Sequence, residues 1–287
     1  MPRGLDHLVL AARDLDAAAR FYERLGFQVG ARNRHPWGTE NRIVQLAGSF
    51  LELITVGEGA QIEPHEPRHY SFGAFVRDYL DRREGLAMLV LDSENARGDA
   101  TRFAQAGVGD FEPFFFERKA RRPDGAEVPV GFTLAFAQDA EAPLAGFFVC
   151  QQHRPENFWN EAFQRHPNGA LGLSVVAYAV PDPEAHRAFL ATFTGATPTR
   201  PRGHDLSFAL ARGRLDVMTP DDAAEIYGSV EAETDSGCFV AYAVRIAEVE
   251  AQAHRLEAAA IPYQRIGSRL VVPASAAFGV AIAFETT

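Results

Sequence analysis

A histidine and a carboxylate interrupt two otherwise apolar strand patterns near the start of this sequence. His7 lies within Leu5–Ala11, and Glu52 lies within Phe50–Val56. A lone carboxylate in such a strand is costly to bury unless it is paired or bound to a metal. Imidazole and carboxylate together suit Fe(II), Mn(II), Zn(II) or Ni(II). The pair therefore indicates either a divalent metal site or a direct hydrogen bond between His7 and Glu52 without a metal.

A polar loop between two expected strands carries further candidate residues. His35, Trp37 and Asn41 lie in this loop, in a setting of Pro and Gly, and Arg42 follows directly. Binding residues are often presented on such loops, so we expect these four side chains to form a wall for a polar substrate. Arg42 is either a partner for a substrate carboxylate or a surface arginine at the start of a strand.

The segment that carries His7 recurs later in the chain. Residues 4–27 and 172–195 share an apolar strand, a turn with Asp, and an amphipathic helix closed by Gly, which indicates an internal repeat. The two copies align without a gap, and Val175 stands where the first copy has His7. Weaker copies cover 86–107 and 238–260. The chain is therefore expected to contain four units.

Each unit is expected to follow the order β-α-β-β-β. In the first, the patterns predict strands at 5–11, 27–32, 42–46 and 50–56, with a helix from Asp14 to about Gly26. A junction at 153–169, rich in Pro, Asn and His, separates two pairs of units. We therefore expect an N-terminal domain over 1–160, which holds any active site, and a degenerate C-terminal domain over 168–287.

Composition limits the possible functions. The chain has 287 residues, of which 47% are hydrophobic, so it can bury a substantial core. A net charge of −10 without long basic runs disfavours nucleic acid as a partner. No apolar window is long enough for a membrane span, and the start shows no signal-peptide pattern, so we expect a cytoplasmic protein. The one basic run, 118–122, is expected to be a solvated hairpin loop or a contact for an anionic substrate tail.

Several segments resemble the vicinal oxygen chelate superfamily. They are LDHLVL at 5–10, ARFYERLGF at 19–27 and LEL at 51–53. The segments 34–42 and 147–159 are similar to the glyoxalase-like branch of bacterial proteins. The resemblance implies an α+β fold of four βαβββ modules in two paired-module domains, each pair forming a cup. Members include lyases, epimerases, dioxygenases and metal-free antibiotic-binding proteins, so the fold does not decide the function.

In that superfamily the first and fourth strands of each module supply metal ligands. The resemblance thus implies ligands at His7 and Glu52, but the first strand of the second module has Met88 at the matching position. Its fourth strand ends in Gln152 and His153, of which only one can face the cup. His153 would complete a 2-His-1-carboxylate set, whereas Gln152 would be a weaker ligand.

Two functions follow from this resemblance. The first is a divalent-metal-dependent enzyme of lyase, isomerase or oxygenase type, which acts on a small oxygen-bearing substrate by Lewis-acid chemistry, with Glu52 as ligand or catalytic base. The alternative is a metal-free small-molecule binder of the bleomycin-resistance type, with an aromatic cup lined by Trp37, Phe114, Phe116, Phe132 and Phe148. Because one chain holds both module pairs, we expect a monomer or homodimer.

Overall fold

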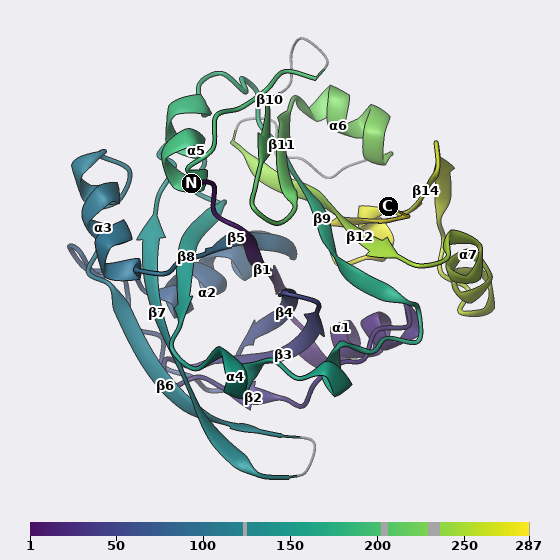
Figure 1. Ribbon diagram of the computed structural model, residues 1–287, viewed down its shortest axis with the longest axis horizontal. Helices are drawn as coiled ribbons and strands as arrows, with labels where there is room; N and C mark the ends of the chain where they lie inside the picture. The colour runs from purple at the N-terminus through teal and green to yellow at the C-terminus, as the bar shows by residue number, and fades with distance from the viewer. Residues whose placement is uncertain (123–124, 202–205, 229–235, 287) are drawn as a thin grey trace.

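The computed structural model describes residues 1–122, 125–201, 206–228 and 236–286, and it is an α+β structure with two curled sheets (Figure 1). The first sheet has the strand order β2-β3-β4-β1-β5-β8-β7-β6, and the second has the order β10-β11-β9-β12-β15-β14-β13. Each sheet joins two units through an antiparallel pair, β1 with β5 and β9 with β12. Three of the units have the order β-α-β-β-β, and within the described residues the third has two strands after its helix, β10 and β11, with an isolated bridge between Thr199 and Ser207. The prediction of four modules in two pairs is confirmed.

The bounds of the elements follow the repeat. The first sheet contains β1 (Leu5–Ala11), β2 (Asn33–Arg34), β3 (Thr39–Leu46), β4 (Ser49–Val56), β5 (Gly85–Asp92), β6 (Phe114–Arg121), β7 (Glu127–Ala137) and β8 (Gly146–Gln152). The second contains β9 (Ala170–Ala179), β10 (Leu206–Ala209), β11 (Arg214–Met218), β12 (Cys238–Ile246), β13 (Gln264–Ile266), β14 (Arg269–Val272) and β15 (Ala281–Glu285). The helices are α1 (Leu15–Arg24), α2 (Phe72–Arg82), α3 (Ala96–Gln105), α4 (Pro155–Phe158), α5 (Arg187–Thr194), α6 (Pro220–Tyr227) and α7 (Val249–Ala258).

The second strand of the first module differs from its prediction. Residues 27–32 are not a strand, and β2 is only Asn33–Arg34. Phe27 is buried in the core, but the residues after it run along the edge of β3 with a single backbone bond, from Gly30 N to Ile43 O at 2.8 Å. This segment contains Gly30 and several exposed side chains, and it does not form a full ladder of backbone hydrogen bonds with β3. The polar loop expected to carry His35 is therefore shorter in the structure, where it is the hairpin turn between β2 and β3.

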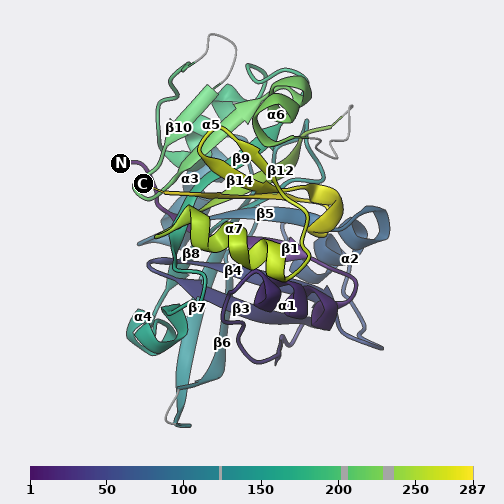
Figure 2. The same ribbon diagram turned by 90° about the vertical axis from the view of Figure 1, so that its right-hand side faces the viewer.

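The two sheets pack back to back. Their shared core contains Leu8 and Leu10 from β1 and Val176 and Tyr178 from β9. Helices flank this core in pairs from different sheets: α1 lies beside α7, and α3 lies beside α5 (Figure 2). Because the core is shared, the division into domains 1–160 and 168–287 stays a prediction.

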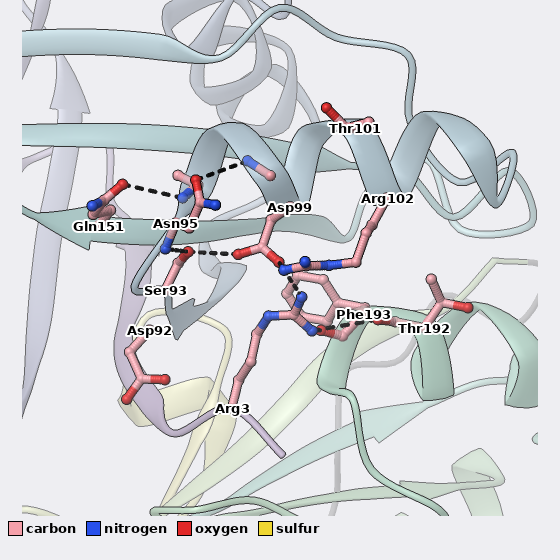
Figure 3. Close-up of polar contacts among 12 residues, drawn as sticks. Arg3, Asp92, Ser93, Asn95, Asp99, Thr101, Arg102, Gln151, Thr192 and Phe193 are labelled. Carbon is pink, nitrogen blue, oxygen red and sulfur yellow. Dashed lines mark hydrogen bonds and ion pairs between the residues drawn. The ribbon is translucent and has the colours of Figure 1, made fainter. Parts of the chain in front are cut away.

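The N-terminal segment connects two of these helices (Figure 3). The guanidinium of Arg3 donates to Asp99 Oδ1 on α3 and to the carbonyl of Phe193 on α5, each at 2.5 Å. The other carboxylate oxygen of Asp99 accepts from Ser93 Oγ at 2.5 Å, and Arg102 also binds Asp99. Arg3 and Asp99 thereby connect α3, which flanks the first sheet, to α5, which flanks the second.

The opposite face of each sheet is its cup, with a hydrophobic cluster of its own. In the first sheet this cluster includes Val9, Phe50 and Phe148, and α2 packs into it through Phe72 and Val76. In the second sheet, α6 covers the corresponding face. Within the described residues, no helix has the length and apolar character needed to cross a membrane.

Candidate functional site

The first cup contains a small cavity with the predicted pair at its floor. It offers about 50 Å³ to water-sized molecules. Its lining is mostly aromatic and comes from six strands together with α2, α4 and the β2–β3 turn: His7, His35, Trp37, Asn41, Ile43, Phe50, Glu52, Phe72, Phe116, Arg118, Phe132, Leu134, Phe148, Cys150 and Phe158. Glu52 is the one carboxylate in this lining, and only 6% of the residue is exposed.

Glu52 lies between two imidazoles. Its Oε2 is 3.8 Å from His7 Nε2, and its Oε1 is 3.9 Å from His35 Nε2. Both distances exceed a hydrogen bond, so the direct His7–Glu52 hydrogen bond left open by the sequence is not formed. The carboxylate instead accepts a hydrogen bond from the side-chain amide of Asn41.

The orientation of His7 is determined by its neighbour. Its Nδ1 lies 2.6 Å from Asp6 Oδ2, and Asp6 Oδ1 accepts from Gln152 Nε2 at 3.0 Å. Because a carboxylate accepts, His7 donates through Nδ1–H. In the neutral ring, the lone pair of Nε2 therefore points toward Glu52.

His35 has the same tautomer for a different reason. The amide nitrogen of Asn41, whose oxygen accepts from Asn33, donates to His35 Nε2 at 3.2 Å. His35 Nδ1–H therefore donates to Thr39 Oγ1, at 2.8 Å. Burial lowers the pKa of His35 to about 4, although the charge of Glu52 opposes this effect. The ring is neutral at pH 7, with a second lone pair beside Glu52.

Two imidazole nitrogens and a carboxylate thus lie around one small volume, in which the Asn41 amide now donates to His35 Nε2 and to Glu52. This donor set suits a divalent transition metal, and the carboxylate behind His7 is a common arrangement for a metal-binding histidine. In the described part of the chain, no three His, Cys, Asp or Glu side chains already have the spacing of a metal site. With metal–ligand bonds of about 2.1 Å, neighbouring ligand atoms lie about 3.0–3.4 Å apart, so small movements of His7 and His35 would be needed.

Two other predicted residues also line the cavity. The ring of Trp37 stacks on His35 with centroids 4.4 Å apart, and its buried Nε1–H has no hydrogen-bond partner. Phe148 contacts the His7 ring edge-on at 5.5 Å. These side chains surround the polar atoms with apolar walls.

The structure does not bring Arg42 and His153 to this cavity. Strand alternation turns Arg42 to the other face of β3, where it donates to Asp16 at 2.9 Å and to the carbonyl of Gly30. His153 is exposed, and its Nε2 contacts Thr133 Oγ1 at 2.7 Å. Phe148 and Cys150 line the cup, so the alternation that admits them and Gln152 turns His153 away.

Asp6 is a residue near the site that the sequence did not single out, and Arg118 was considered only as part of the basic run 118–122. Adjacent residues of a strand normally face opposite sides, but the β1–β5 register shifts between Leu5 and His7, which lets Asp6 reach the His7 ring. Two consecutive polar residues in a buried strand were the available signal. The basic run 118–122 was expected to be a solvated hairpin loop or a contact for an anionic substrate tail, and Arg118 lies on β6, whose alternate residues face the cup.

In the part of the chain that the structure describes, the second cup has no equivalent of this site. Asp216, which corresponds to Glu52, lies 2.8 Å from the guanidinium of Arg214 and accepts from Ser207 Oγ at 2.7 Å. Val175 occupies the first-strand position. The positive charge of Arg214 therefore already balances the Asp216 carboxylate.

Two sheets of paired βαβββ modules, each around a cup, make this a protein of the vicinal oxygen chelate superfamily. The chain belongs to the glyoxalase-like domain family, whose model matches residues 5–194. No curated protein matches the sequence.

Solved structures show the same fold at low identity. A hypothetical protein from Staphylococcus aureus is 11% identical, with a TM-score of 0.72 over 99% of each chain. A mutant of 4-hydroxymandelate synthase from Streptomyces coelicolor is 12% identical, with a TM-score of 0.58 over 99% of this chain and 92% of that one. A xylose isomerase-like TIM barrel/4-hydroxyphenylpyruvate dioxygenase fusion protein is 15% identical, with a TM-score of 0.52, and this chain spans 40% of its length.

Proposed function

We propose that this protein is a divalent-metal-dependent enzyme, of lyase, isomerase or oxygenase type, that acts on a small oxygen-bearing substrate in the first cup. One observation carries the proposal: the acceptor atoms of His7, His35 and Glu52 converge in a buried volume. Among the described residues, no Lys or Arg nitrogen lies within 4 Å of the Glu52 carboxylate. A bound cation would balance this cluster.

His7, His35 and Glu52 would hold the metal, with His35 in the role that the sequence assigned to His153. When bound, such an ion polarises a carbonyl oxygen or stabilises an enediolate as a Lewis acid. The protein's own groups prepare the site. Asp6 fixes the tautomer of His7. The Asn41 amide donates to His35 Nε2 and to Glu52, so it would have to give up its bond to His35 for that nitrogen to bind the metal. The aromatic lining limits the access of water to the reacting oxygen atoms.

A metal-free small-molecule binder is the second candidate. It is favoured by the mostly aromatic lining and by the lack of a preformed ligand set among the described residues. In that case, Asn41 and the free indole N–H of Trp37 would serve as polar anchors.

Metal content separates the two candidates. We expect protein purified without chelator to carry near-stoichiometric metal by mass spectrometry, and His7→Ala, His35→Ala and Glu52→Gln to lose it. His153→Ala is the matched control, because it removes an imidazole outside the cavity. Wild-type protein that neither contains nor takes up Mn(II), Fe(II), Zn(II) or Ni(II) would contradict the enzyme and favour the binder. Iron would point to oxygenase chemistry, and zinc or nickel to a lyase or isomerase.

A further inference from the structure

A second, larger cavity adjoins the first. It measures about 410 Å³, which is within the range of pockets that hold small organic ligands. The two cavities share Ile43, Arg118 and Phe158 in their linings. The lining of this second, outer cavity comes largely from β3, β6, α4 and the segment that follows α4. In Figure 1, α4 lies beside β7 and β3. A ligand in the outer cavity would therefore lie against residues that also line the cavity of Glu52.

The lining of the outer cavity is positively charged. Among the described residues it contains Arg118, Arg121 and Arg122 together with several amide side chains, and no Asp or Glu. Arg121 lies 3.8 Å from Glu127, and Arg122 donates to Asn157 Oδ1 at 2.7 Å. These two side chains already have partners in the protein.

Arg118 differs from its neighbours. Within the described residues, its guanidinium has no carboxylate within 4 Å, and its one hydrogen bond goes to the carbonyl of Lys119, at 3.3 Å. Burial lowers the pKa of Arg118 and the charge of Glu52 raises it, but an arginine with an ordinary pKa above 12 stays charged. The cation that both cavities share is thus available for an anionic ligand.

The rest of the outer lining is apolar or aromatic. It includes Val29, Ala120, Phe158, Trp159 and Phe163. Trp159 packs edge-on against Phe158 with centroids 4.9 Å apart, so this wall is continuous with the aromatic lining of the inner cavity. A planar apolar body would fit against it, because aromatic rings favour stacked and edge-on contacts.

We propose that the two cavities together bind a small aromatic carboxylic acid, with its carboxylate on Arg118 and its ring against Phe158 and Trp159. In this placement, an oxygen next to the carboxylate can reach the inner cavity and Glu52. The identification of this ligand as the substrate rests on the function proposed above. The binding itself does not, since neither Arg118 nor the aromatic wall requires a metal.

Calorimetry on chelator-treated protein tests the proposal with two probes, 2-naphthylacetate and its neutral analogue 2-naphthylacetamide. We expect the acid to bind the wild-type protein about tenfold more tightly than the amide, because a hydrogen bond between two charged groups is stronger than one to a neutral amide. Arg118→Gln should remove this preference, and Arg118→Lys should restore part of it. Lys119→Gln is the matched control, because it removes one positive charge from the exposed face of the same strand.

Equal affinities for acid and amide in the wild-type protein would overturn the proposal. So would a preference that survives in Arg118→Gln, or no binding of either probe. If the preference is found but no metal is bound, the metal-dependent function fails and the acid-binding site stands. If metal binds to His7 and Glu52 without any preference for the acid, the function stands and this ligand class is wrong.

Discussion

Asp6 is the residue on which the orientation of His7 depends. Its carboxylate holds His7 Nδ1–H at 2.6 Å and thereby keeps Nε2 as an acceptor toward Glu52. An asparagine at this position can accept the same hydrogen bond, but it lacks the negative charge that makes the ring a stronger donor to a metal. The charge behind the histidine is therefore as relevant to the chemistry as the ring.

We predict that Asp6→Asn lowers the affinity for a divalent metal by about tenfold or more, because partners behind a metal-bound histidine contribute on this scale. The measurement is a titration of chelator-treated protein with Zn(II) and Mn(II), followed by calorimetry. His153→Ala should leave both affinities unchanged. An Asp6→Asn protein that binds these metals as tightly as the wild type would show that Asp6 does not support a ligand.

The sequence predicted some of these residues better than others. His7 and Glu52 could be found because each interrupts a strand that is buried on both faces. His153 was chosen wrongly because strand alternation gives two possible faces, and nothing in the sequence fixes which one is the cup. His35 was found only as a wall residue, since its approach to Glu52 depends on the tight turn between β2 and β3.

The elements show the same limit. The internal repeat predicted four modules, because an apolar strand followed by an amphipathic helix is a local pattern. The edge segment 27–32 was predicted wrongly, because its pairing depends on the neighbouring strand and not on its own residues. The back-to-back packing of the sheets could not be predicted. Because β1 has apolar residues on both faces, its sequence does not show which face packs against the second sheet and which face lines the cup.

Asp99, near the start of α3, makes the attachment of α3 to α5 sensitive to acid. Burial alone would raise the pKa of this carboxyl, but the hydrogen bonds from Ser93 and Arg3 lower it below its ordinary value. A carboxylate with a lowered pKa in the folded state stabilises the fold at pH values above its unfolded pKa. This contribution is lost as the pH falls through the lower folded value.

We predict that Asp99→Asn destabilises the protein by about 2 kcal/mol at pH 7, because it leaves the half-buried Arg3 without its counter-charge. The difference from the wild type should begin to shrink below about pH 4, where this carboxyl becomes protonated in the unfolded chain, and should go on shrinking as the pH falls through the lower pKa of the folded state. Urea unfolding at a series of pH values measures both effects. Asp78→Asn, on an exposed ion pair of α2, should change stability by less than about 0.5 kcal/mol at any pH. A difference for Asp99→Asn that is constant down to pH 3 would contradict the role of its charge.

Because the two sheets share one hydrophobic core, we expect them to unfold together in a single cooperative transition. That core includes a buried polar contact between the two layers, in which the hydroxyl groups of Tyr22 on α1 and Tyr242 on β12 lie 2.7 Å apart. Burial raises the pKa of both, so both stay neutral, and each hydroxyl has the other as its partner. Removal of one leaves the other buried without a hydrogen bond.

We predict that Tyr22→Phe and Tyr242→Phe each cost about 1–3 kcal/mol of stability, whereas the double variant costs less than the sum of the two. The reason is that the second substitution removes the hydroxyl that the first one left unsatisfied. A double-mutant cycle by urea unfolding, with a single transition for all four proteins, measures the coupling. Tyr263→Phe, whose hydroxyl binds Glu257 at the surface, is the control and should change stability by less than about 0.5 kcal/mol. Strictly additive costs would mean that each hydroxyl finds water when its partner is lost, and two separate unfolding transitions would mean that the sheets fold independently despite their common core.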